Sequence, residues 1–108
     1  MNNVEQKIEE LIEAIRESDV YREYRTQQDI INQVPELKRQ IDDYRKRNFD
    51  LEMARDTDLV RIEEFRREFK DFRENPVVDN YLASELAFCR MMQQSMFHIY
   101  ESIDFDLD

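Results

Sequence analysis

The sequence predicts an all-α fold, on the evidence of its turn residues and of the spacing of its apolar residues. None of the 108 residues is glycine and only two are proline, whereas tight β-hairpin turns depend strongly on glycine. Apolar side chains recur every three or four residues along most of the chain, which is the period of one helix face. At this length we expect a single helical domain over residues 1–108, a bundle or hairpin of about four to five helices that is elongated and oligomeric.

The composition also bears on the partners and location of the protein. Large apolar groups are too frequent for a disordered acidic tail, with 11% aromatic residues, so we expect the chain to fold. A net charge of -10 disfavours direct binding to nucleic acids and to anionic membrane surfaces. No apolar run approaches the ~20 residues of a membrane-spanning helix, and the first residues lack the pattern of a signal peptide. We therefore expect a cytoplasmic protein without membrane insertion.

An apolar stripe predicts the first helix over about residues 2–17. Ser18 then has the residue type of a helix N-cap, and Asp19 places an acid in the next first turn. A second helix is therefore expected over about residues 19–33. The stripe of the first helix has spacings of four, three and four, and consists of Val4, Ile8, Leu11 and Ile15.

Proline marks the start of the third expected helix. Pro35 suits a first helical position, and the apolar pattern that follows predicts a helix over about residues 35–55. One helix over residues 35–74 would be about 60 Å long, which is longer than a compact domain of this size. Apolar residues are also missing near positions 56–58. We therefore expect a break there and a fourth helix over about residues 58–74.

The last helix has the clearest start signal. Asn75 is a favoured N-cap residue and Pro76 suits the first helical position, so we expect a helix over about residues 76–103, followed by a short acidic tail at 104–108. Further apolar residues lie off its main stripe, so its apolar surface is too wide for one partner helix. The main stripe consists of Val78, Leu82, Cys89, Met92, Met96, Ile99 and Ile103.

Methionine and aromatic residues of this last helix are the candidate protein-interface residues. Methionine fills irregular gaps and suits adaptable protein–protein surfaces, although an ordinary core is the alternative explanation. The width of the apolar surface favours a contact with another protein chain, in a homo-oligomer or a hetero-oligomer. The candidates are Tyr81, Phe88, Met91, Met92, Met96 and Phe97.

No catalytic, metal-binding or cofactor-binding residues are predicted. Cys89 lies within the apolar stripe, so we expect it to be buried in the core. His98 follows nine residues later, nearly on the opposite side of the helix, where it cannot act as a base for Cys89. Ser95 stands where a ferritin-like Glu-x-x-His motif needs glutamate. We expect neither an enzyme nor a protein with a cofactor or small-molecule substrate.

Basic residues in the middle of the chain leave one alternative open. Eleven of the sixteen Lys and Arg residues lie between positions 35 and 75, where they could contact RNA phosphates. Acidic residues are interleaved with them, which favours a salt-bridged surface. The two basic clusters are Arg45-Lys46-Arg47 and Arg66-Arg67-Lys70-Arg73.

Several short motifs together resemble those of one protein family. They are Leu11-Ile12-Glu13-Ala14-Ile15 followed by Ser18, Tyr21 and Tyr24; Pro35-Glu36-Leu37 followed by Ile41 and Tyr44; and Asn75-Pro76-Val77-Val78 followed by Tyr81-Leu82-Ala83-Ser84-Glu85 and Phe88. Over about residues 5–103 the chain thereby resembles the YlbF/YmcA family of small bacterial helical proteins, which also includes YheA. The last group of motifs is the most specific.

The resemblance implies an all-helical, often oligomeric protein without known catalytic residues. Some family members regulate competence, sporulation and biofilm formation in Firmicutes, in a complex that modulates messenger-RNA processing by a membrane-associated ribonuclease. Partner proteins hold iron–sulfur clusters there through cysteines, which the lone Cys89 cannot do by itself. We therefore expect a non-catalytic, protein-binding regulatory adaptor. The alternatives are a self-associating helical scaffold or holdase-like module, and weak RNA contact through the basic middle segment.

Overall fold

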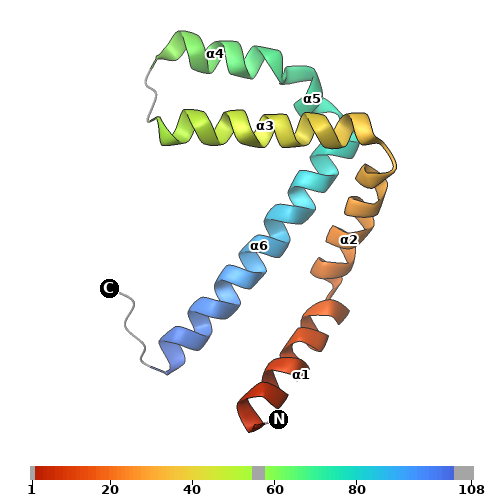
Figure 1. Cartoon of the computed structure of the whole chain (residues 1–108), viewed down its shortest axis with the longest axis vertical. Coiled ribbons are helices and arrows are strands. Elements are labelled where there is room, and N and C mark those ends of the chain that lie inside the picture. Colours follow the sequence, from red (N-terminus) through yellow and green to blue (C-terminus); the bar gives the residue numbers. More distant parts are fainter. Residues whose placement is uncertain (1, 55–57, 104–108) are drawn as a thin grey trace. The chain divides into compact units, whose positions relative to one another are not determined.

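A computed structural model of the chain describes residues 2–54 and 58–103. These residues form helices without any strand, so the all-α prediction is confirmed (Figure 1). The chain divides into two compact units. The terminal unit comprises Met1–Thr26 and Ala83–Asp108, and the middle unit comprises Gln27–Leu82. The described residues contain six helical segments, namely α1 (Asn3–Glu17), α2 (Asp19–Asn32), α3 (Pro35–Met53), α4 (Leu59–Glu68), α5 (Lys70–Glu74) and α6 (Pro76–Ser102).

Side chains cap the starts of several helices. Ser18 Oγ accepts a hydrogen bond from the backbone N–H of Tyr21 at 3.2 Å, and Asn75 Oδ1 accepts one from Val77 at 3.0 Å. Both bonds satisfy backbone donors that have no partner within the helix. The sequence predicted both caps, and the structure confirms them.

The segment over residues 35–74 is not one helix. The third helix ends at Met53 and the fourth begins at Leu59, while residues 55–57 of the expected break lie outside the described residues. The expectation of one helix over residues 58–74 differs from the structure, because the backbone at Phe69 (φ -101°, ψ 13°) separates α4 from α5. Phe69 packs against the rings of Tyr44, Phe65 and Phe72. The spacing of apolar residues alone does not predict an interruption of the helix at this position.

An aromatic cluster around Tyr44 joins α3 to α4 and α5 in the middle unit. The rings of Phe65, Phe69 and Phe72 all lie with their centroids 5.4–5.5 Å from that of Tyr44. Arg73 Nη1 donates a hydrogen bond of 2.7 Å to the Tyr44 hydroxyl. Aromatic pairs of this kind contribute about 0.5–1.5 kcal/mol each beyond burial. The buried apolar residues of this unit are Ile31, Ile41, Phe65, Phe69, Val78 and Tyr81.

Packing in the terminal unit is thinner. None of the residues of α1 is buried. An aromatic contact joins α2 to α6, where Phe88 lies against Tyr21 and Tyr24 with centroid distances of 5.4 and 5.3 Å. The stripe that predicted α1 remains largely exposed, with exposed fractions of 66% for Val4, 48% for Ile8 and 41% for Leu11.

The N-cap of α6 provides a test of how firmly this helix start is fixed. Asn75→Ala removes the acceptor for the Val77 N–H and should lower the free energy of unfolding by about 1 kcal/mol. Urea unfolding at equilibrium, followed by circular dichroism, measures the change. Asn80→Ala is the matched control, since Asn80 is exposed within the same helix, where alanine is the better helix former. Equal destabilisation by both changes would contradict the capping role.

Candidate protein-binding surface

One side of α6 is sheltered by the rest of the chain. Phe88 is half-buried between its two tyrosine neighbours, and Ser84 is buried, with 7% of its surface exposed. Spacings of three and four place the sheltered residues on one stripe, which we call the inner face. Its members are Val78, Tyr81, Glu85, Phe88, Met92 and Ser95, all buried or half-buried.

This placement corrects the predicted main stripe of α6. Cys89 is exposed, so the prediction that it is buried in the core was wrong. Apolar residues surround so much of the helix that apolarity alone does not identify its inward side. The position of Phe88 against the tyrosines of α2 decides the orientation, and it turns Cys89 outward. His98 is exposed, as the sequence predicted.

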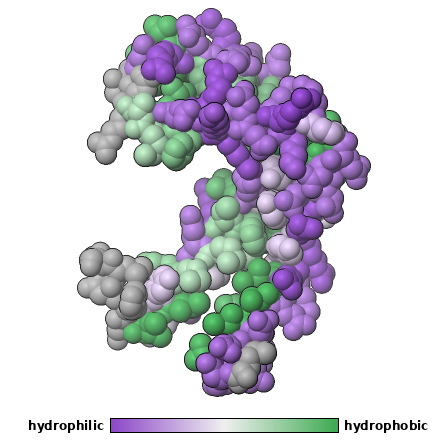
Figure 2. All heavy atoms as spheres, in the orientation of Figure 1, coloured by the Kyte–Doolittle hydropathy of each residue, from purple (hydrophilic) through white to green (hydrophobic). Residues whose placement is uncertain are grey.

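A second stripe of α6 lies about a quarter turn round the helix from the inner face, because its residues 86, 89, 93 and 96 each directly follow an inner-face residue. Met96 is 40% exposed and Leu86 50% exposed, and Phe97 beside the stripe is 66% exposed. In Figure 2, hydrophobic residues gather over the C-terminal half of α6 and over α1. We call this stripe the outer face, and it consists of Leu86, Cys89, Gln93, Met96, Tyr100 and Ile103.

The six predicted interface residues occupy different positions. Tyr81 is 7% exposed, and its hydroxyl accepts a hydrogen bond from Arg45 Nη2 at 3.4 Å within the middle unit. Met91 is half-buried, as is Phe88 on the inner face. The interface role of these residues remains a prediction.

Three of the predicted residues lie together on one surface. Met92, Met96 and Phe97 line a shallow apolar depression with Gln93 and Tyr100. Sequence reasoning did not include Leu86 or Tyr100 among the candidates. The sequence feature that could have identified them is the continuous alternation of three- and four-residue spacings from Leu86 to Ile103. The broader apolar pattern of α6 obscured it.

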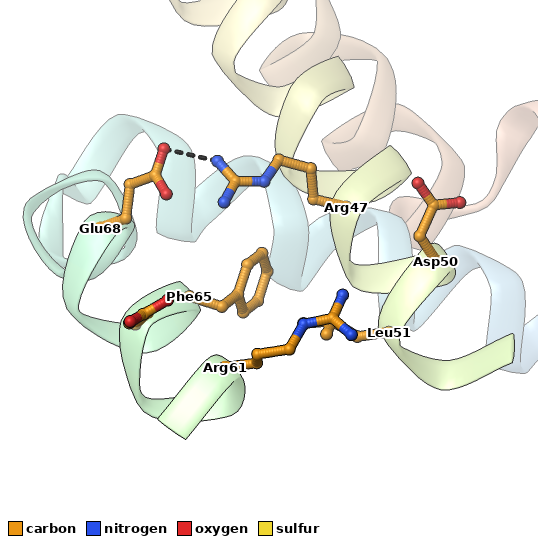
Figure 3. Close-up of a pocket in the computed structure, with 7 residues that line it drawn as sticks. Arg47, Asp50, Leu51, Arg61, Phe65 and Glu68 are labelled. Atoms are coloured by element: carbon orange, nitrogen blue, oxygen red, sulfur yellow. Dashed lines mark hydrogen bonds and ion pairs between the residues drawn. The ribbon is translucent and has the colours of Figure 1, made fainter. Parts of the chain in front are cut away.

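A separate hollow of about 240 Å³ lies between α3 and α4 in the middle unit. Arg47 extends from α3 and donates a hydrogen bond to the Glu68 carboxylate on α4, as Figure 3 shows. Its guanidinium also lies over the rings of Phe65 and Phe69, at 5.9 and 5.2 Å from their centroids. The positive charge of Arg47 is thus paired within the chain. The hollow is lined by Arg47, Asp50, Leu51, Arg61, Glu64, Phe65 and Glu68.

Other basic residues of the middle unit also have partners within the chain. Arg39 forms an ion pair of 2.8 Å with Glu36. The guanidinium of Arg45 lies 5.6 Å from the ring centroid of Tyr81, and that of Arg73 lies 5.4 Å from the centroid of Tyr44. Arg45 and Arg73 of the basic clusters thus contact aromatic rings within the chain, while the expected salt-bridged surface of the two clusters as a whole stays a prediction.

Searches of the described residues add two findings. Across residues 2–54 and 58–103, no three His, Cys, Asp or Glu side chains are grouped so that they could hold a metal ion. Within the same ranges, each helix is too short or too polar to cross a lipid bilayer.

Comparison with known proteins identifies the family. Residues 4–104 match the family described as "Control of competence regulator ComK, YlbF/YmcA". The chain belongs to this family. The resemblance over residues 5–103 is thereby confirmed, and the family description supports a regulatory role for this YlbF/YmcA protein.

One curated relative covers nearly the whole chain. A UPF0342 protein from Caldicellulosiruptor bescii (strain ATCC BAA-1888 / DSM 6725 / KCTC 15123 / Z-1320) is 25% identical over 112 residues. The match covers 97% of the YlbF/YmcA protein and 92% of that relative. No solved structure matches the chain significantly.

The Arg47–Glu68 pair predicts a pH dependence of stability. The hydrogen bond from Arg47 holds the pKa of the Glu68 carboxyl below its ordinary value of 4.5. A depressed pKa in the folded state contributes stability above the unfolded-state value, and this contribution is lost as the pH falls through the folded-state value. Glu68→Gln should therefore lower the urea midpoint near neutral pH, and the difference from wild type should shrink well below pH 4.5.

The matched control for this pair is Glu63→Gln. Glu63 is also an exposed acid of α4, and it carries the same change in formal charge. Its urea midpoint should stay close to that of wild type near neutral pH. A constant difference between Glu68→Gln and wild type at every pH would show that the ion pair does not stabilise the fold.

Proposed function

We propose that this YlbF/YmcA protein is a non-catalytic regulatory adaptor that acts by binding other proteins. Its complex modulates messenger-RNA processing and thereby competence, sporulation and biofilm formation. The observation that carries the proposal is the family match over residues 4–104, whose description names control of a competence regulator. The family match supports regulation, and the exposed apolar surface supports action through protein contacts.

The exposed apolar surface of the terminal unit supports a binding role. Val4 on α1 and Phe97 on α6 are each 66% exposed, and Leu86 is 50% exposed. Soluble monomers rarely expose contiguous apolar patches of more than a few hundred Å² unless the patch contacts a partner. Covering these residues with another protein removes them from water, which favours association.

Electrostatics support the non-catalytic part of the proposal. Among the described residues, resolved pKa shifts belong to Arg47 and Glu68, which form an ion pair at the protein surface. Catalytic acids and bases typically combine burial in a cleft with a nearby charge that shifts the pKa toward the working pH. The Arg47–Glu68 pair instead moves each pKa further from neutrality.

Mapping of cellular RNA ends tests the proposed function. We expect that deletion of the gene in its host removes a defined set of processed messenger-RNA ends and lowers competence. Re-expression of the wild-type protein should restore both. Unchanged RNA ends and unchanged competence after deletion would contradict the adaptor proposal and favour the self-associating scaffold.

A further inference from the structure

We propose that a groove between α3 and α4, on the side of Tyr44, binds an acidic amphipathic helix of a different protein. The inference rests on the proposed function, because it describes the chemistry of one protein that the adaptor binds. We call this groove the Tyr44 groove. It has a volume of about 380 Å³ and is lined by Tyr44, Asn48, Leu51, Glu52, Ile62, Phe65 and Arg66.

The Tyr44 groove has apolar side chains between two helices. Leu51 on α3 and Ile62 on α4 are half-buried, and Phe65 beside them is buried. A channel between two helices accepts a third helix, whose ridge of side chains packs into it. An extended segment has no sheet edge to pair with here, since the described residues of this unit contain helices and no strand. A helix with one apolar stripe therefore fits the groove.

Basic side chains on this side of α4 and α5 carry charges that the chain does not neutralise. Arg66 lines the groove, and neither Arg66 nor Lys70 forms a side-chain ion pair or hydrogen bond with another described residue. Arg73 donates a hydrogen bond of 2.7 Å to the Tyr44 hydroxyl, which positions its guanidinium but leaves its charge uncompensated. All three basic side chains are exposed, so carboxylates of a partner can reach them.

The spacing of these cations matches that of acids along one side of a helix. Residues 66, 70 and 73 follow one another at intervals of four and three. Backbone hydrogen bonds from Phe69 to Phe65 (3.2 Å) and from Arg73 to Phe69 (2.9 Å) continue the helical pattern across the interruption. Arg66 and Arg73 are thus two turns, or roughly 10 Å, apart along the axis. Carboxylates seven residues apart on a partner helix are separated by the same distance.

The hollow beside Arg47, also between α3 and α4, is less suited to an acidic partner. Three carboxylates line it, those of Asp50, Glu64 and Glu68, and Arg47 already donates a hydrogen bond to Glu68. The Tyr44 groove has a single lining carboxylate, Glu52. The charges therefore direct an acidic helix to the Tyr44 groove.

A second copy of the chain and an RNA strand both match the groove less well. Symmetric dimers bring the same surface of two copies together, so pairing through this groove would place Arg66 and Lys70 opposite the same cations. RNA phosphates would leave the apolar side chains of the groove uncovered. The Tyr44 ring already packs against three phenylalanine rings, which limits its stacking on a base. Charge complementarity therefore favours an acidic amphipathic helix.

Titration of the full chain with two synthetic peptides tests the proposal. The probe is a helical peptide of about 18 residues, with leucine on one side and glutamate along the edges of that side. The matched peptide has glutamine at each glutamate position. Isothermal titration calorimetry at low salt should show micromolar binding of the glutamate peptide and about fivefold weaker binding of the glutamine peptide. Equal affinities for both peptides, or no binding of either, would overturn the proposal.

Two variants test whether the glutamate peptide occupies the Tyr44 groove. Arg66→Gln should lower its affinity by about threefold, because one exposed charge pair is lost. Arg67→Gln is the matched control, since Arg67 is exposed on α4 but lines a separate depression with Leu59 and Val60. This control should bind the peptide like the wild type. An equal loss in both variants would indicate general charge attraction and overturn the proposal. If Arg66→Gln does not fold, the two peptides on the wild type still decide the question.

Two further measurements test the other occupants. Arg66→Gln should self-associate to the same degree as the wild type in sedimentation equilibrium, and weaker self-association would indicate that a second copy occupies the groove. Single-stranded oligouridylate RNA should not displace the glutamate peptide. Displacement would assign the groove to RNA, and either of these results would overturn the proposal.

These outcomes are distinguishable from those for the proposed function. A chain that does not bind the glutamate peptide, but whose deletion alters RNA ends, would reject the groove proposal and retain the adaptor. A chain that binds this peptide in the groove, but whose deletion changes neither RNA ends nor competence, would retain the groove proposal and reject the adaptor.

Discussion

The structure depends on the fact that α6 is apolar on two sides, while α2 covers only one of them. Phe88 is held between Tyr21 and Tyr24, and this contact fixes which side of α6 faces inward. The adjoining side, about a quarter turn round the helix, exposes Leu86 and Met96 to water. Burial of apolar area is the main favourable term in both folding and association, so the remaining exposed face favours assembly.

The two compact units differ in how their small cores are packed. In the middle unit, Tyr44 collects three phenylalanine rings and a hydrogen bond from Arg73. In the same unit, Arg47 donates a hydrogen bond to Glu68, and its guanidinium lies over the rings of Phe65 and Phe69. In the terminal unit, α1 contributes no buried residue. The terminal unit therefore has the thinner core, although the middle unit also exposes large apolar side chains, with 78% of Leu59 and 68% of Met53 exposed.

Local signals in the sequence predicted the fold class and most helix starts. Ser18 and Asn75 cap helices because their side-chain oxygens satisfy nearby backbone donors, an interaction that needs no distant residue. Phe69 could not be recognised as an interruption, since the residue is neither proline nor glycine and its contact with Tyr44 joins residues that are distant in the sequence. The orientation of α6 was similarly hidden, because its inner face includes Glu85 and Ser95 whereas its outer face includes methionine and leucine.

The candidate surface could be predicted only in part for the same reason. Met96 and Phe97 were identified from composition and lie exposed, whereas Tyr81 is occupied by Arg45 within the chain. By contrast, Leu86 and Tyr100 could be assigned to the outer face only after the inward side of α6 was known. The family match adds a regulatory context over residues 4–104, whereas the role of the exposed residues in protein binding stays a proposal.

The accessibility of the Cys89 thiol tests this account most directly. Cys89 is exposed in the single chain and lies in the middle of the outer face. Its rate of reaction with a thiol reagent should be nearly as high in the folded protein as in the urea-unfolded protein, because the contact of Phe88 with Tyr21 and Tyr24 leaves Cys89 exposed. A rate that is far lower in the folded protein than in the unfolded protein would show that Cys89 is buried in the core and that α6 is oriented differently.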